Sequence, residues 1–339
     1  MKQVKILEPG KVIVEEAAMP VRKPGEAILK LLYGGICGSD AGTYAGRFLY
    51  AGYPRIPGHE FSAQVVDVDE DNAYGVRKGM IVTCNPYFNC GKCYSCRRGY
   101  VNCCTSNETM GAQRDGAFRE YISMPLERIY DGKGLPARTL AAIEPFCIGY
   151  HAVKRGRVQP GDRVLVVGAG TIGYLTAAAA KLKGASVYVC DVAPDKLEYV
   201  RRLGIDGTIL NTGDEAFKEQ VQSITGGDGF DVCLEAVGFP STVMNCIDAA
   251  AFRGRVVVIG VGKQSFDFFY PVIQTKELDI CGSRNAVKED FLELIDAVSA
   301  GQVDLDSIVS AEYSFTDAAR AFEDFKCNSG KLLKVMLKF

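Results

Sequence analysis

Four cysteines stand close together in a polar stretch of the chain, at intervals of three, three and eight residues. Thiolates two residues apart can both reach one metal ion at about 2.3 Å, and a fourth thiolate from a short loop completes a tetrahedral shell. Such a shell leaves no position for water, so it predicts a structural zinc site. Disulfides or surface thiols are the alternative, but this spacing strains disulfide geometry and nothing else suggests secretion. The predicted ligands are Cys90, Cys93, Cys96 and Cys104.

A second group of metal-ligating residue types lies on either side of this loop. Cys37 follows a predicted strand, His59 and Glu60 open the next strand, and Glu144 lies in the segment IEPF. Sulfur, imidazole and carboxylate form an adequate shell for a zinc ion with one open position, which catalysis needs. Each residue also has a simpler interpretation, as a buried thiol or a supporting carboxylate. His59 carries most weight, because the other histidine, His151, is expected to pack or cap at the domain junction.

A glycine-rich turn between a predicted strand and a predicted helix indicates a dinucleotide site. Gly168 allows the tight turn, Gly170 lets the backbone approach a pyrophosphate, and Gly173 lets the helix pack on the strand. The helix N-terminus adds free N–H groups and a positive dipole end. The complete turn is Gly168, Ala169, Gly170, Thr171, Ile172 and Gly173.

Asp191 ends the next predicted strand, VYVCD, and bears on the choice of cofactor. A carboxylate there accepts hydrogen bonds from the ribose 2′-OH and repels a 2′-phosphate, and neither Val192 nor Ala193 offers a cation to reverse this preference. NAD is therefore favoured over NADP. Asp191 could instead cap the helix that begins near Pro194.

The order of predicted strands and helices along the chain indicates an α/β protein with two domains. Residues 1–150 read as short strands broken by glycine and proline, which is typical of a β-rich lobe. Residues 151–285 contain six strands separated by segments of helical period, which predicts a doubly wound parallel sheet. Residues 286–339 contain two amphipathic helical stretches and a terminal strand, KLLKVMLKF, which is expected to return to the first lobe.

Composition limits the class of partner. With 339 residues, 47% of them hydrophobic, the chain can bury two cores. A net charge of −2 without a basic run argues against nucleic acid or a membrane surface as a partner and favours a small molecule. Thirteen cysteines cannot all pair, and the N-terminal sequence lacks a signal-peptide pattern, so we expect a cytoplasmic protein.

The order of these motifs resembles that of the zinc-dependent medium-chain dehydrogenases over essentially the whole chain. The matching segments are GGICGSD, PGHE, the four-cysteine loop, IEPF, GAGTIG and Asp191. The likeness is greatest to the sorbitol, L-threonine and sugar-acid (L-idonate or L-galactonate 5-dehydrogenase-like) branch, because Glu144 stands where many alcohol dehydrogenases have cysteine. The resemblance implies a GroES-like catalytic domain, a Rossmann domain, an active site between them, and a dimer or tetramer joined through the Rossmann sheet.

The resemblance also implies roles for individual residues. Cys37, His59 and either Glu60 or Glu144 would hold a catalytic zinc, with the other carboxylate near the open metal position. Ser39 would take the substrate proton. Arg284, in GSRNA, matches a place where relatives contact substrate, although a bridge between domains is an equal alternative.

One departure from the family pattern concerns proton transfer. Many relatives carry a histidine five residues beyond the zinc cysteine, where this chain has Gly42. Thr43, Tyr44, a ribose hydroxyl or ordered water could complete the relay instead.

The function implied is NAD-dependent oxidation of a secondary alcohol of a polyol or sugar acid of the L-idonate, L-galactonate or L-gulonate type. An L-threonine 3-dehydrogenase or a sorbitol dehydrogenase is the alternative within the branch. The missing relay histidine also leaves open a non-catalytic NAD-sensing or zinc-storing protein. A zinc-free quinone reductase is a further alternative, but that branch usually lacks both sets of metal ligands.

Overall fold

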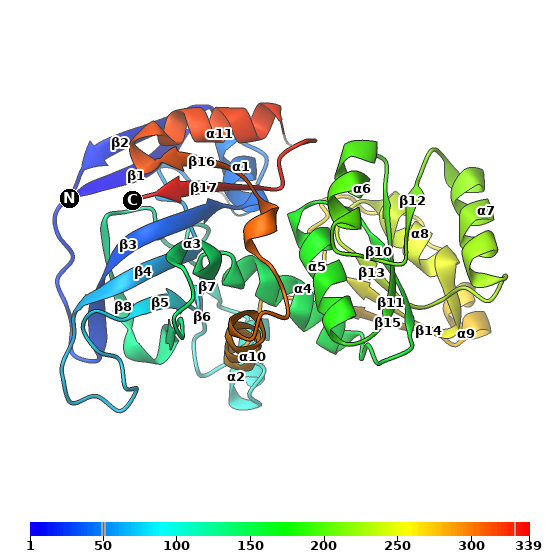
Figure 1. Ribbon diagram of the computed structural model, residues 1–339, viewed down its shortest axis with the longest axis horizontal. Coiled ribbons are helices and arrows are strands. Elements are labelled where there is room, and N and C mark those ends of the chain that lie inside the picture. Colours follow the sequence, from blue (N-terminus) through cyan, green and yellow to red (C-terminus); the bar gives the residue numbers. More distant parts are fainter. Residues whose placement is uncertain (49, 51, 329) are drawn as a thin grey trace. The chain divides into compact units, whose positions relative to one another are not determined.

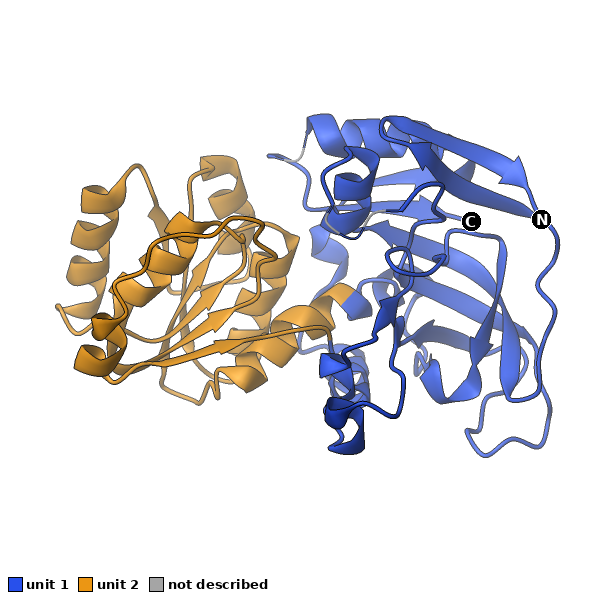
Figure 2. Cartoon of the chain, turned by 180° about the vertical axis from the view of Figure 1, so that it is seen from behind, with its two compact units in different colours: residues 1–144, 286–339 blue, residues 145–285 orange. Residues whose placement is uncertain are grey.

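The chain forms two compact units, which Figure 2 shows in different colours. The computed structural model describes residues 1–48, 50, 52–328 and 330–339. The first unit consists of residues 1–144 and 286–339, and the second of residues 145–285. The first division falls after Glu144 rather than after Tyr150, because helix α4 (Ile143–Arg155) runs on without a break into the second unit.

The first unit is built on a β-sheet in which segments from both ends of the chain lie side by side (Figure 1). Its strands run in the order β16-β17-β3-β4-β5-β9, with β8 also paired to β3. The C-terminal strand β17 pairs antiparallel with β3, so Val335 lies opposite Ile36. The strands are β3 (Glu26–Ile36), β4 (Glu60–Asp67), β5 (Ile81–Cys84), β8 (Tyr121–Pro125), β9 (Ile129–Asp131), β16 (Val309–Ser314) and β17 (Lys334–Lys338).

Two short two-stranded sheets and five α-helices complete the described part of the first unit. The buried side chains of β3, β4 and β5 form one core, which includes Leu29, Phe61 and Val82. A second core gathers β1, β17 and α11 around Phe118 and Phe322. The elements are β1 (Lys2–Glu8), β2 (Lys11–Glu16), β6 (Tyr87–Phe88), β7 (Glu108–Thr109), α1 (Gly38–Tyr44), α2 (Tyr94–Arg97), α3 (Ala137–Leu140), α10 (Lys288–Ser299) and α11 (Ala318–Cys327).

The second unit is a six-stranded parallel sheet in the order β12-β11-β10-β13-β14-β15. Counted within the unit this order is 3-2-1-4-5-6, which is that of a Rossmann fold, so the predicted fold class is confirmed. The apolar run of β10 is buried, as expected for a parallel strand with helices on both faces. The strands are β10 (Arg163–Val167), β11 (Ser186–Asp191), β12 (Gly207–Leu210), β13 (Phe230–Glu235), β14 (Ala250–Val258) and β15 (Asp279–Gly282).

Helices follow the strands of the second unit in alternation, which is the β-α-β pattern typical of parallel sheets. Amphipathic α7 buries Phe217 and Val221 against the sheet and ends at Gly226, which adopts a left-handed conformation. The helices are α5 (Thr171–Leu182), α6 (Pro194–Arg201), α7 (Asp214–Thr225), α8 (Pro240–Ala249) and α9 (Pro271–Lys276). Within the described residues, every helix is too short or too polar to cross a membrane.

Candidate functional site

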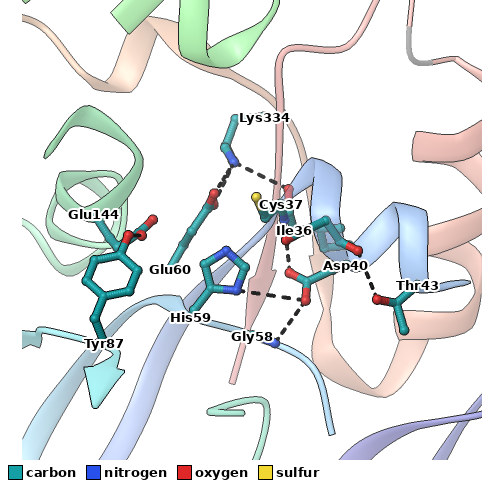
Figure 3. Close-up of polar contacts among 11 residues, drawn as sticks. Ile36, Cys37, Asp40, Thr43, Gly58, His59, Glu60, Tyr87, Glu144 and Lys334 are labelled. Atoms are coloured by element: carbon teal, nitrogen blue, oxygen red, sulfur yellow. Dashed lines mark hydrogen bonds and ion pairs between the residues drawn. The ribbon is translucent and has the colours of Figure 1, made fainter. Parts of the chain in front are cut away.

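The pairing of β3 with β4 brings two predicted metal ligands together. Gly35 lies opposite Glu60 in this antiparallel pair. Cys37, which follows the end of β3, therefore lies near His59, which precedes the start of β4. The ligand atoms of Cys37, His59 and Glu60 all lie within 4.8 Å of one another. Figure 3 shows these three side chains gathered at one place.

Glycine at position 35 makes room for this cluster. A Cβ atom there would overlap the Oε2 atom of Glu60 and lie 3.3 Å from the Cδ atom of Lys334. Any larger residue would therefore displace the Glu60 carboxylate from the place where it meets Cys37 and His59. This close approach requires glycine at position 35, whereas a Cβ atom on the preceding Gly34 would overlap the ring of Phe118.

Asp40 is a buried carboxylate that the sequence analysis did not identify. Its Oδ2 atom accepts a hydrogen bond from Cys37 N at 3.1 Å, and its Oδ1 atom accepts one from Gly58 N at 3.2 Å. The same Oδ1 lies 4.0 Å from Nδ1 of His59. Asp40 thus fixes the backbone on both sides of the cluster and places a carboxylate next to the imidazole, at a distance beyond that of a direct hydrogen bond. An acidic residue three positions after Cys37, at the start of a helix, was the available signal.

Lys334 is a second residue that sequence reasoning missed. It lies on β17, is 2% exposed, and donates hydrogen bonds to both carboxylate oxygens of Glu60 at 2.8 and 2.6 Å. It also donates to the carbonyl oxygen of Ile36 at 3.3 Å. Burial alone would lower the pKa of Lys334, but the Glu60 carboxylate raises it above its usual value. A lysine among the apolar residues of the terminal strand was the only signal.

Glu144 opens α4 and is 3% exposed. Its Oε1 atom accepts a hydrogen bond from the hydroxyl of Tyr87, a residue on β6. Burial raises the pKa of Glu144 to about 7. In Figure 3 its side chain lies nearer to Glu60 and His59 than to Cys37. Its oxygens are not among the ligand atoms that lie within 4.8 Å of one another.

The electrostatics of this cluster suit a divalent cation. The carboxylates of Asp40, Glu60 and Glu144 are buried, Lys334 pairs with that of Glu60, and a buried carboxylate is costly without a partner. Burial lowers the pKa of His59, but Cys37 and then Asp40 outweigh this effect and raise it well above its ordinary value. Soft sulfur, imidazole and carboxylate are also the donors that zinc takes in catalytic sites. The residues present therefore fit a zinc ion.

The residues considered for proton transfer lie on α1. Ser39 is half-buried, and its carbonyl oxygen accepts the hydroxyl of Thr43 at 3.0 Å. Tyr44 donates its hydroxyl to Glu323 at 2.7 Å. At Gly42 the carbonyl oxygen accepts N–H groups of the following turn, and a Cβ there would lie 3.4 Å from the Cβ of Phe48. The hydroxyls of Thr43 and Tyr44 thus both donate hydrogen bonds to acceptors within the fold.

The four predicted structural ligands converge in the loop between β6 and β7. The sulfur atoms of Cys90, Cys93, Cys96 and Cys104 lie within 4.8 Å of one another, and none of these four forms a disulfide. Backbone N–H groups of Cys96 and Thr105 lower the pKa of the Cys93 thiol to about 5. N–H groups of Cys90 and Ser106 point at the Cys104 sulfur at 3.2 and 3.4 Å. Donors aimed at sulfur stabilise thiolates, the form that binds zinc.

In the second unit the glycine turn lies between β10 and α5, as predicted. Gly168 has a φ of 104°, a conformation that favours glycine. A Cβ atom on Gly173 would overlap the carbonyl oxygen of Gly168, whereas a Cβ on Gly170 would meet no heavy atom within 4 Å. Gly170 precedes Thr171 and Ile172 as the N-cap of α5, so this backbone is open to a pyrophosphate.

Asp191 lies at the end of β11 beside this turn. Its Oδ2 atom accepts a hydrogen bond from Ala169 N at 2.7 Å, and its Oδ1 atom accepts one from Ala193 N at 2.8 Å. The carboxylate therefore joins the dinucleotide turn to the start of α6. This arrangement serves both interpretations of Asp191, because each oxygen keeps a lone pair for a ribose hydroxyl while bonding the backbone.

Two further residues named from the sequence lie in the second unit. His151 is buried in α4, outside both groups of metal-ligating residues found in the described part of the chain. Arg284 is exposed and follows β15. Its contact with substrate stays a prediction.

Comparison with known proteins agrees with these sites. Residues 23–133 match the alcohol dehydrogenase GroES-like domain family, and residues 171–300 match the zinc-binding dehydrogenase family. The chain is 33% identical to L-galactonate-5-dehydrogenase of Escherichia coli K12, over 98% of this chain and 97% of that protein. It is 32% identical to sorbitol dehydrogenase of Halalkalibacterium halodurans, over 97% and 96% of the two chains.

A solved structure has the same fold over the whole chain. The NADH complex of the alcohol dehydrogenase RspB from Escherichia coli CFT073 superimposes with a TM-score of 0.91, at 30% identity, covering 100% of this chain and 99% of that one. The GroES-like and Rossmann fold assignments are thereby confirmed. This chain belongs to the zinc-dependent medium-chain alcohol dehydrogenases and is an oxidoreductase of the polyol and alcohol dehydrogenase type.

Proposed function

We propose that the protein is an NAD-dependent dehydrogenase that oxidises a secondary alcohol of a sugar acid of the L-galactonate, L-idonate or L-gulonate type. The convergence of Cys37 with the buried side chains of His59 and Glu60 carries this proposal. The substrate class is supported by 33% identity to an L-galactonate-5-dehydrogenase. Sorbitol is the second candidate, supported by 32% identity to a sorbitol dehydrogenase.

In this proposal Cys37, His59 and Glu60 hold the catalytic zinc, and Glu144 lies beside it. The grouping of ligand atoms within 4.8 Å supports Glu60 over Glu144. When bound, zinc supplies a Lewis acid for the substrate oxygen and NAD accepts the hydride. Asp40 fixes the backbone of Cys37 and Gly58, and Lys334 holds the Glu60 carboxylate, so the ligand set is positioned before substrate arrives.

Ser39 takes the substrate hydroxyl proton in this mechanism, and its hydroxyl passes its own proton on to ordered water. It lies on α1 between Cys37 and Asp40, so its hydroxyl is close in sequence to the metal ligands. Arg284 is assigned to a hydroxyl or carboxylate of the substrate, because its guanidinium can bind a carboxylate through two hydrogen bonds.

NAD is the proposed cofactor. Asp191 places a carboxylate next to the glycine turn, where it would accept a ribose 2′-OH and repel a 2′-phosphate. Gly168, Gly170 and Gly173 form the turn, with Thr171 and Ile172 starting the helix that faces the pyrophosphate.

We also propose that the protein is a cytoplasmic homo-oligomer. Thirteen free thiols support a reducing compartment. Strand β15 ends the sheet order of the second unit, and Phe269 and Tyr270, which precede helix α9, are 76% and 73% exposed. An edge strand and exposed aromatic residues are both features that favour pairing with a second copy. Light scattering of the purified protein tests this, and a monomer would contradict it.

The substrate proposal is tested by following NADH absorbance with zinc-loaded protein. The panel contains L-galactonate, L-idonate, L-gulonate, sorbitol and L-threonine. We expect kcat/KM to be highest for one of the three sugar acids. A higher value for sorbitol would support the second candidate, and a higher value for L-threonine would overturn both.

A further inference from the structure

The carboxylate of Glu144 is oriented by a tyrosine from another part of the chain. Tyr87 is 6% exposed and donates its hydroxyl to the Oε1 atom of Glu144, as Figure 3 shows. A glutamate side chain rotates about three bonds, so a fixed donor on one oxygen defines where the other oxygen points. The position of the Glu144 carboxylate beside the cluster is thereby fixed.

The backbone of Tyr87 is fixed by hydrogen bonds to two side chains and by strand pairing. Its N–H donates to Oδ1 of Asn85 at 2.9 Å, and its carbonyl oxygen accepts from Nη1 of Arg128 at 2.6 Å. Strand β6 also pairs with β7, with Tyr87 opposite Thr109. The side chain of the next residue, Phe88, stacks with Arg128, whose guanidinium carbon lies 4.5 Å from the ring centre. These contacts fix the backbone from which the Tyr87 side chain extends.

The same contacts tie Tyr87 to the four-cysteine loop. This loop begins directly after β6 and ends directly before β7, so the β6–β7 pair closes its base. Arg128 is 8% exposed and donates a second hydrogen bond to Oδ1 of Asn89 at 2.9 Å. The amide of Asn89 in turn lies 3.7 Å from the sulfur of Cys96. A line of contacts thus runs from a structural metal ligand through Asn89, Arg128 and Tyr87 to Glu144.

We propose that Tyr87 is a positioning residue of the dehydrogenase reaction. It fixes the Glu144 carboxylate beside the catalytic metal, and the four-cysteine loop holds Tyr87 in place through Arg128 and Asn89. This inference rests on the proposed function. On this proposal the four-cysteine loop does more than stabilise the fold, because it also determines the position of the Glu144 carboxylate.

Tyr87→Phe is the direct test, because it removes the hydroxyl and keeps the ring. Tyr313→Phe is the matched control, since Tyr313 donates its hydroxyl to a carboxylate oxygen of Asp324 at 2.7 Å elsewhere in the first unit. In zinc-loaded enzyme we expect Tyr87→Phe to lower kcat about tenfold or more, with the KM for NAD and the melting temperature close to wild type. Tyr313→Phe should leave kcat within about twofold. Equal kcat values for the two variants would overturn the proposal.

A spectroscopic readout separates this inference from the proposed function. With cobalt(II) replacing zinc, the visible absorption of the catalytic ion reports on the ligands around it. We expect Tyr87→Phe to shift this absorption and Tyr313→Phe to leave it unchanged. If wild-type enzyme oxidises no substrate while the shift is seen, the proposed function fails and the Tyr87–Glu144 relationship stands. If wild type is active and both the spectrum and kcat of Tyr87→Phe match it, the inference fails alone.

The link to the four-cysteine loop is tested with Asn89→Ala in a double-mutant cycle. Variants are compared at equal zinc content. We expect Asn89→Ala to lower kcat less than Tyr87→Phe does, and the double variant to be no slower than Tyr87→Phe alone, because both changes act on one line of contacts. Decreases that multiply in the double variant would show that Asn89 acts independently of Tyr87.

Discussion

Lys334 and Glu60 form a buried ion pair beside the catalytic cluster. The ammonium of Lys334 lies 2.8 and 2.6 Å from the two carboxylate oxygens of Glu60, and the side chains are 2% and 1% exposed. The two residues are 274 positions apart in the chain. The last strand of the protein thus supplies the countercharge for a carboxylate that flanks the predicted metal ligand His59.

Replacing Lys334 with methionine should destabilise the first unit. Glu60 would lose the ammonium that pairs with its buried carboxylate, and breaking a buried pair in this way costs about 3 to 5 kcal/mol. Urea unfolding of the zinc-loaded protein measures the change in free energy. Lys338→Met, at an exposed position of the same strand, is the control. A loss below about 1 kcal/mol at Lys334 would show that the pair contributes little.

Zinc content distinguishes the two carboxylates. After dialysis we expect Glu60→Gln to keep about one zinc per chain and Glu144→Gln to keep about two, because only Glu60 converges with Cys37 and His59. Metal analysis by mass spectrometry gives the answer. The reverse result would make Glu144 the ligand and leave Glu60 as the partner of Lys334.

Asp40→Asn should weaken the catalytic site while preserving its shape. Loss of a carboxylate beside a metal-bound histidine typically costs about 10- to 100-fold in metal affinity or activity. Asp290→Asn is the matched control, because Asp290 is also buried and accepts the N–H three residues before it, at the start of α10. Zinc release to a chelator and kcat/KM are measured together. Similar losses in both variants would indicate helix capping alone.

Asp191→Ser should change the cofactor preference. The carboxylate that repels a 2′-phosphate disappears, so the ratio of kcat/KM for NAD to that for NADP should fall by about tenfold or more. Initial rates with each cofactor provide the ratio. Asp206→Asn serves as the control, since Asp206 also accepts a backbone N–H on β11, from Val187 at 2.7 Å. An unchanged ratio in Asp191→Ser would place the cofactor choice elsewhere.

Adjacent cysteines test the structural site. Cys104 is buried among the four sulfurs, whereas Cys103 is exposed and lies outside that group. Structural zinc binding is worth about 10 to 16 kcal/mol in small peptides, comparable to the whole stability of a domain. We therefore expect Cys104→Ser to lose one zinc and to unfold at a markedly lower temperature, while Cys103→Ser keeps both ions. Thermal melts with metal analysis decide between these outcomes.

The sequence predicted those features that depend on local spacing. The strand-turn-helix around Gly168 and the cysteine loop are encoded within short segments, and the alternation of strands with helices defined the Rossmann unit. Asp40, Tyr87 and Lys334 were missed, because their importance comes from contacts made across the fold. Lys334 acquires its role only when β17 pairs with β3, a register that no local pattern specifies.

The boundary between the two units could also be predicted only in part from the sequence. Glu144 and the rest of α4 look like a single segment, and the helix pattern gives no reason to separate them. In the structure Gly149 packs so closely on α5 that a Cβ atom would lie 2.7 Å from Thr176 N. That tertiary contact assigns most of α4 to the second unit.

Hydride transfer is the central claim, and isotope transfer tests it most directly. Wild-type and Cys37→Ser proteins are incubated with deuterated NADH and the keto acids that correspond to L-galactonate, L-idonate and L-gulonate, and the products are examined by mass spectrometry. The account predicts that deuterium appears at the carbinol carbon of at least one product with wild type and in none with Cys37→Ser. Absence of deuterium in every wild-type product, or equal transfer by both proteins, would contradict it.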